Sequence, residues 1–220
     1  MYTDSVGAFF DMDHTVLRGS SGMLYLRYLL QTRRLSWLRW AGIIAQVGLY
    51  VTGISDYPRL MARLMAQVSR RGEAEAWQIS AEWFEAVLKH YITELARERI
   101  AWHRRQGHQP ALISAATPYA VKPVAAALGL GDAYLATTLA TSGGRFTGQL
   151  GEVCYGPGKL AMAGRYAAQH GLDLSQSYFY SDSHEDLPLL ETVGHPVAVN
   201  PNRKLARIAA ARGWPVMKFY

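Results

Sequence analysis

Residues 6–15 read VGAFFDMDHT, an apolar run that ends abruptly at the two acids Asp11 and Asp13. A continuous apolar run of this length is typical of a central strand that is covered on both faces. Asp11 and Asp13 then follow the carboxyl end of that strand, which is where open α/β sheets form their ligand sites. The stretch therefore predicts a sheet whose first strand delivers two carboxylates to a site.

Strand and helix patterns alternate from residue 110 to the end of the chain. This alternation predicts a doubly wound α/β fold, a mostly parallel, Rossmann-like sheet with right-handed crossovers. Gly143, Gly144 and Gly148 additionally indicate a small β-hairpin flap, built from residues 145–147 and 149–151. The expected strands are 110–114, 134–138, 178–181, 196–199 and 215–219, and the expected helices are 118–129, 159–170, 186–192 and 203–212.

Residues 20–103 contain no credible strand and carry apolar residues at helical spacing instead. The spacing predicts helices near residues 23–30 and 60–68, and one long helix from residue 73 to about 104. We therefore expect an all-helical cap domain over 20–103, inserted into a catalytic core formed by 1–19 and 104–220.

The segment from Trp40 to Ile54 is almost entirely apolar. It is shorter than the roughly 20 residues that a membrane-spanning helix needs. We interpret it as a buried cap helix. The alternative is a helix lying in a membrane interface, because arginines and tryptophans precede it in residues 33–40.

Composition limits the class of protein. Half of the 220 residues are hydrophobic, which is enough to form a proper core. A single cysteine, Cys154, excludes an intramolecular disulfide, and the polar residues 1–5 do not resemble a secretory signal, so we expect a cytoplasmic protein. The net charge of +6 comes from basic residues spread along several segments, so a nucleic-acid partner is not expected.

Four separated features could carry chemistry: the DMDHT cluster, Ser114 at the end of a strand, Lys159 after a glycine-rich turn, and Asp182 with Asp186 after strand 178–181. Each has an ordinary alternative, such as a helix cap, a solvated lysine or acids that favour a helix dipole. A parallel sheet would bring all four to one crevice. Their common placement indicates a single site.

The four features resemble the motifs of the haloacid dehalogenase superfamily, in its phosphoserine phosphatase-like branch. The matching stretches are FFDMDHTVL, LISAATP, Lys159 and SDSHEDLPLL, and the resemblance covers essentially the whole chain. It implies a Mg²⁺-dependent phosphomonoester hydrolase that acts on a small phosphorylated metabolite. The rival interpretation is a membrane-surface or nucleic-acid binding protein that retains the fold without turnover.

The resemblance assigns the acidic residues. Asp11 would be the nucleophile that forms a phospho-aspartate, and Asp13 the general acid and base. The Mg²⁺ ligands would be Asp11, the backbone carbonyl of Asp13, and Asp182, while Asp186 would hold bound water or support Lys159. The resemblance also implies that the chain bends directly after Asp11.

The resemblance also assigns the groups that bind phosphate. These are the Ser114 hydroxyl, the backbone N–H of Ala115 and the Lys159 ammonium. Thr15 is placed with them, fixing the turn and stabilising the acid-base carboxyl. Phosphoserine-specific relatives carry a glutamate nine residues after the nucleophile, where this chain has Ser20. We therefore expect that free phosphoserine is not the preferred substrate; the oligomeric state stays open.

Overall fold

The computed structural model describes residues 5–52, 54, 59–60, 63–64 and 72–220. Its centre is a six-stranded sheet in the order β3-β2-β1-β6-β7-β8, in which every neighbouring pair is parallel. The predicted Rossmann-like α/β core is confirmed. The strands are β1 (Gly7–Phe10), β2 (Gln109–Ser114), β3 (Tyr134–Ala136), β6 (Tyr178–Ser181), β7 (His195–Val199) and β8 (Val216–Met217).

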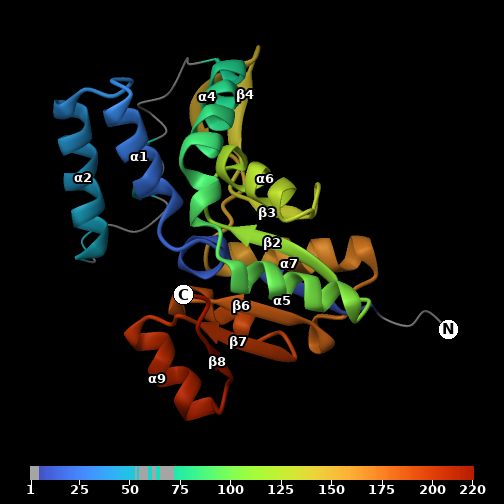
Figure 1. Cartoon of the computed structure of the whole chain (residues 1–220). Helices are drawn as coiled ribbons and strands as arrows, with labels where there is room; N and C mark the ends of the chain where they lie inside the picture. The colour runs from blue at the N-terminus through green and yellow to red at the C-terminus, as the bar shows by residue number, and fades with distance from the viewer. Residues whose placement is uncertain (1–4, 53, 55–58, 61–62, 65–71) are drawn as a thin grey trace.

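Helices cover both faces of the sheet, and Figure 1 shows α5 on one side of it and α7 on the other. Phe10 packs in a cluster with residues of α5 and α6, whereas its neighbour Phe9 packs with residues of α7, α8 and α9. Both rings are fully buried, which explains why the first strand is apolar at successive positions. The helices are α5 (Glu94–Arg105), α6 (Pro118–Ala127), α7 (Pro157–His170), α8 (Leu187–Leu190) and α9 (Arg203–Arg212).

The described part of residues 20–103 is helical, with α1 (Ser21–Gln31), α2 (Trp37–Val51) and α4 (Glu73–Ala86) standing to one side of the sheet (Figure 1). The predicted helix over 60–68 lies largely outside the described residues. The predicted domain division between residues 103 and 104 stays a prediction. Most of α5 precedes this division, yet α5 contacts β2 and the turn after Asp11.

The single long helix predicted from residue 73 to 104 is wrong. The chain leaves the helix at Val87, passes through the 3₁₀ turn η2 (Leu88–Tyr91), and starts α5 after Thr93. The Thr93 hydroxyl accepts a hydrogen bond from the N–H of Ala96, which makes it an N-cap. Leu88 and Ile92 stay buried across the break. The apolar residues therefore keep a helical spacing in the sequence even though the helix is interrupted.

The flap is also built differently from the prediction. It pairs β4 (Leu139–Ser142) with β5 (Arg145–Leu150), and the chain turns at Gly143 and Gly144. Both of these glycines have positive φ, +55° and +71°, as a two-residue hairpin turn requires. Gly148 lies inside β5 and does not form a turn.

The helix α2 contradicts the prediction of a buried segment. Ile43 is its only buried side chain among those described, and the others are half-buried or exposed. In the described residues, no helix has the length and apolar character needed to cross a membrane.

Candidate active site

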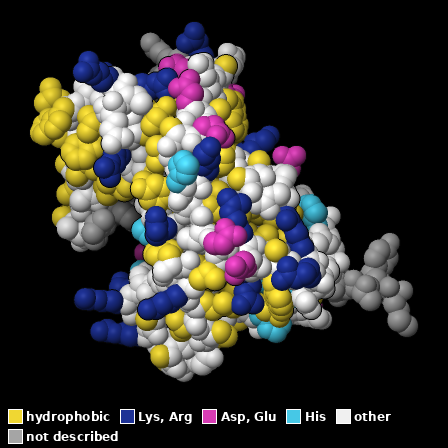
Figure 2. Space-filling model, viewed as in Figure 1, with side chains coloured by type: hydrophobic (Ala, Val, Ile, Leu, Met, Phe, Trp, Pro, Cys, Tyr) yellow, Lys and Arg dark blue, Asp and Glu magenta, His cyan; other side chains and the backbone are white. Residues whose placement is uncertain are grey.

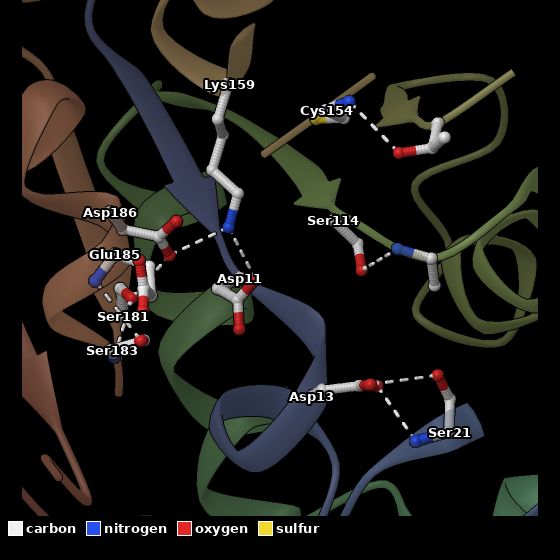
Figure 3. A network of polar contacts seen from close by, with 12 residues as sticks. Asp11, Asp13, Ser21, Ser114, Cys154, Lys159, Ser181, Ser183, Glu185 and Asp186 are labelled. Carbon is white, nitrogen blue, oxygen red and sulfur yellow. Dashed lines mark hydrogen bonds and ion pairs between the residues drawn. The ribbon is translucent and has the colours of Figure 1, made fainter. Parts of the chain in front are cut away.

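Asp11 lies at the carboxyl end of β1, and its N–H donates to the carbonyl of Tyr180 on β6 at 2.9 Å. The chain then closes a tight turn, η1 (Met12–Val16), in which the N–H of Leu17 donates to the carbonyl of Met12 at 2.8 Å. Asp13 keeps extended backbone angles inside this turn, and His14 has φ +57°. The bend expected directly after Asp11 is present, and it carries Asp13 away from the strand (Figure 3).

Asp11 and Asp186 share one buried ammonium. The Nζ atom of Lys159 lies 2.8 Å from Asp11 Oδ1 and 2.7 Å from Asp186 Oδ2. The Ser181 hydroxyl donates to the same Asp186 oxygen at 2.6 Å. These residues come from β1, the start of α7, the end of β6 and the turn before α8, so the fold gathers distant segments at one point (Figure 3).

Lys159 owes its position to the turn that opens α7. Gly156 has φ +52°, and a Cβ atom on Gly158 would stand 2.1 Å from the carbonyl oxygen of Val153, so neither position accepts a larger residue without rearrangement. Lys159 is 2% exposed. Burial opposes its charge, but the carboxylates of Asp11 and Asp186 outweigh that effect and raise the pKa of the ammonium.

The site carries more carboxylates than cations. Burial raises the pKa of Asp11 and of Asp182, and the Lys159 ammonium partly counters the shift at both. The carboxylate of Asp186 raises both pKa values further, and Asp11 also raises that of Asp182. Asp182 follows β6 directly, and its carbonyl accepts a hydrogen bond from the N–H of Asn202 at 2.8 Å. One ammonium therefore faces three neighbouring acids, and a bound cation would relieve the excess of negative charge.

Asp13 is held by the first residue of α1. Ser21 donates to its carboxylate twice, from the backbone N–H at 3.1 Å and from the hydroxyl at 3.0 Å. Burial raises the pKa of Asp13, and the two Ser21 bonds partly counter that shift. The expected contact from Thr15 is absent: its hydroxyl is buried and has no partner in the described structure.

Ser114 ends β2, the strand next to β1, and is 2% exposed. Its oxygen accepts a hydrogen bond from the N–H of Ala116 at 3.2 Å, which leaves the hydroxyl hydrogen available to a ligand. Ala115 follows in the same half-buried turn. Figure 3 places Ser114 on the flank of Asp11 opposite to Asp186.

Residues 8–191 match the family model described as haloacid dehalogenase-like hydrolase. The chain belongs to this family. It is a phosphatase, because relatives that align along nearly its whole length carry phosphatase names. The family match spans β1 to the end of α8, and so contains every residue of the network around Lys159.

Three proteins are similar to this hydrolase in sequence along most of its length. It is 36% identical to the inhibition of morphological differentiation protein of Streptomyces azureus, over 97% of this chain and 78% of that one. It is 33% identical to a phosphoserine phosphatase of Mycobacterium tuberculosis, over 98% and 71%. A histidinol-phosphatase of Neisseria meningitidis is 29% identical, over 96% and 98%.

Two solved structures resemble the hydrolase in fold. A Bordetella pertussis protein of unknown function is 30% identical and superimposes with a TM-score of 0.89, covering 99% of this chain and 100% of that one. A phosphoserine phosphatase captured as an analogue of its phospho-aspartyl intermediate gives a TM-score of 0.70 at 16% identity, covering 99% and 94%. The second likeness concerns the fold alone.

The sequence did not reveal two serines that position the acids of this hydrolase. Ser21 holds Asp13, and Ser181 bonds to Asp186. The doubled serine at positions 20–21, where a helix begins, was a signal for the first. No sequence signal marked Ser181, whose side chain is fully buried and donates its hydroxyl hydrogen to Asp186.

Proposed function

We propose that this phosphatase hydrolyses small phosphate monoesters through a phospho-aspartate on Asp11, with Mg²⁺ as its cofactor. The main support is the pair of buried ion pairs that Lys159 makes with Asp11 and Asp186, together with Asp13 on the adjoining turn. Phosphate monoesters hydrolyse extremely slowly in water. A carboxylate nucleophile divides the reaction into two easier steps, transfer of phosphoryl to Asp11 and attack of water on the acyl phosphate.

Asp13 would move the proton in both steps. Its carboxyl lies on the turn next to Asp11, and the raised pKa favours the protonated form that a leaving alkoxide needs. After the alcohol departs, the same group accepts a proton from the attacking water. The two bonds from Ser21 fix its orientation.

Binding of the phosphate group is assigned to donors around Asp11. Lys159 supplies an ammonium that is already within hydrogen-bond distance of the nucleophile. Ser114 supplies a hydroxyl hydrogen, and Ala115 a backbone N–H, from the neighbouring strand end. Ser21, and not Thr15, makes the expected bond to Asp13. The phosphate contact of Thr15 stays a prediction.

Mg²⁺ fits the donor set. Asp11 raises the pKa of the neighbouring Asp182, and Asp186 raises that of both, so a cation bound among these acids would relieve their repulsion. In the part of the chain that the structure describes, no three His, Cys, Asp or Glu side chains form a ready metal cluster. The proposed ligands are accordingly two carboxylates and the backbone carbonyl of Asp13; Mg²⁺ commonly keeps several waters besides such ligands. When bound, the ion would neutralise charge between nucleophile and phosphate.

The leaving group is proposed to be larger than serine. A groove of about 500 Å³ includes Ser20 in its lining, the residue directly before Ser21, which holds Asp13. It contains no carboxylate to neutralise an ammonium: its described lining is Ser20, Met23, Leu24, Arg27, Leu30, Gln31 and Trp40. Burying an unpaired ammonium costs several kcal/mol. The groove therefore disfavours free phosphoserine and accommodates an apolar or anionic leaving group.

The first experiment measures hydrolysis of p-nitrophenyl phosphate. We expect turnover with Mg²⁺, none in excess chelator, and inhibition by Ca²⁺, whose looser coordination disturbs alignment. Full activity in chelator would contradict the metal assignment.

The second experiment compares kcat/KM for phosphoserine with that for larger monoesters, including histidinol phosphate, at the same pH and Mg²⁺ concentration. We expect phosphoserine to be the poorer substrate. A clear preference for phosphoserine would show that another acid takes over the role of the missing glutamate at position 20.

A further inference from the structure

The helix α2 exposes apolar side chains that the rest of the described chain does not cover. Trp37 is 64% exposed and Leu38 79%, and beyond the helix Ile54 is 71% exposed. Of the eight large hydrophobic side chains exposed in the described residues, five lie between residues 23 and 54. Figure 2 shows hydrophobic surface gathered over α1 and α2. Large exposed patches of this kind mark interaction surfaces.

The exposed residues lie along one face of α2. At 100° per residue, one stripe holds the exposed Trp37, Leu38, Ala45, Gly48 and Leu49 and the half-buried Ala41. Ile43 points the opposite way and is buried. The 15-residue helix is thus apolar toward solvent, and the outward stripe bears no charged residue.

The stretch of chain that contains this stripe carries charges of a single sign. Residues 14–55 contain five arginines and no aspartate or glutamate. Arg34 pairs with Glu82 of α4 at 2.6 Å, whereas Arg33, which precedes α2, and Arg39, in the first turn of α2, are exposed. Figure 2 shows Lys and Arg side chains bordering the hydrophobic surface. A partner for this region must accept apolar side chains and carry negative charge.

We propose that the outer face of α2 binds the surface of an anionic phospholipid bilayer. The helix would lie flat, with its apolar stripe among the acyl chains and Arg33 and Arg39 on the lipid phosphates, as interfacial amphipathic helices do. A surface position suits the described helices, none of which is long and apolar enough to span a bilayer.

The test is flotation of the full chain with vesicles of phosphatidylcholine, with and without about a third phosphatidylglycerol. We expect binding to the anionic vesicles, at least about tenfold weaker binding to the neutral ones, and release as salt screens the arginines. Leu38→Glu should weaken binding about tenfold or more, because it puts a charge among the acyl chains. The matched control is Leu95→Glu, which alters an exposed leucine of α5.

The charge requirement is tested separately. Replacing Arg33 and Arg39 by glutamine should weaken binding about tenfold, whereas the same change at the exposed Arg203 and Arg207 of α9 should not. All of these variants should hydrolyse p-nitrophenyl phosphate like the wild type, so a failure here is distinct from failure of the proposed chemistry. Absence of binding to anionic vesicles, equal binding to neutral ones, or undiminished binding by Leu38→Glu would overturn the proposal. A dimer that Leu38→Glu dissociates would overturn it too, because a second copy would then cover the face.

Discussion

Replacing Lys159 by methionine should destabilise the protein strongly in the absence of divalent metal. The ammonium makes two buried contacts, 2.8 Å to Asp11 and 2.7 Å to Asp186, and its side chain is 3% exposed. Removing one partner of a buried ion pair typically costs about 3–5 kcal/mol, because it leaves the other charge unpaired. The carboxylate left without its partner can bind a proton instead, and burial has already raised the pKa of Asp11 to about 7 in the folded wild type.

The pH dependence of this loss has a defined sign. In Lys159→Met the folded-state pKa of the carboxylates rises further above the unfolded value, so the folded state binds more protons than the unfolded state. Because the pKa of Asp11 is already about 7 in the folded wild type, the free energy of unfolding of the variant, relative to wild type, should fall as pH rises above about 7, by at most about 1.4 kcal/mol per pH unit for each carboxylate. Added Mg²⁺ should recover part of the loss by supplying positive charge beside Asp11.

Urea unfolding at pH 6, 7 and 8 in chelator, and again with Mg²⁺, measures these effects. The matched control is Lys122→Met, because Lys122 is 52% exposed and makes a 3.8 Å surface pair with Asp132. Such a pair is worth about 0–1 kcal/mol. If Lys159→Met unfolded at the same urea concentration as Lys122→Met at every pH, the charge reasoning for this cluster would be refuted.

Three other variants test single contacts. Asp13→Asn should slow turnover by roughly 10²–10⁴-fold, more for alkyl phosphates than for p-nitrophenyl phosphate, whose leaving group needs no proton; equal slowing would remove its acid role. Ser181→Ala deletes a 2.6 Å bond to Asp186 and should cost about 1.5–3 kcal/mol in urea unfolding, since the acceptor is charged. His103 is buried, and its pKa is lowered to about 3, chiefly by desolvation. The imidazole is therefore neutral in the folded and the unfolded state above pH 6.5, and it lowers the stability of the protein only below that pH. The free energy of unfolding should fall by up to about 1.4 kcal/mol per unit from pH 6.5 toward pH 3, and His103→Gln should flatten that slope.

Sequence reasoning succeeded where local pattern and chemistry agree. The apolar run before Asp11 reflects a strand buried on both faces, where Phe9 and Phe10 enter different clusters. The acids after it, and Lys159 after its glycine turn, are placed by the ends of β1 and the start of α7. Parallel sheets bring strand ends together by topology, so the sequence alone assigns these separated residues to one crevice.

It failed where packing between segments decides the outcome. Residues 73–105 form two helices joined by a 3₁₀ turn, and all three elements contribute to one buried stripe. Apolar spacing cannot distinguish this arrangement from one long helix. The hydropathy of α2 predicts that the helix packs in an apolar environment. It does not indicate whether the rest of the protein provides that environment. The choice of Ser21 over Thr15 as partner of Asp13 depends on the turn at His14, whose positive φ the sequence did not indicate.

Mass spectrometry of the acid-quenched enzyme tests the central claim most directly. During turnover of p-nitrophenyl phosphate, Asp13→Asn should accumulate the covalent intermediate, because its first step needs no acid while the second has lost its base. The account predicts a phosphoryl group on the peptide that contains Asp11, and neither phosphoryl group nor turnover in Asp11→Asn. An Asp11→Asn enzyme that keeps as much as about a tenth of wild-type activity, or a phosphoryl group on another residue, would contradict it.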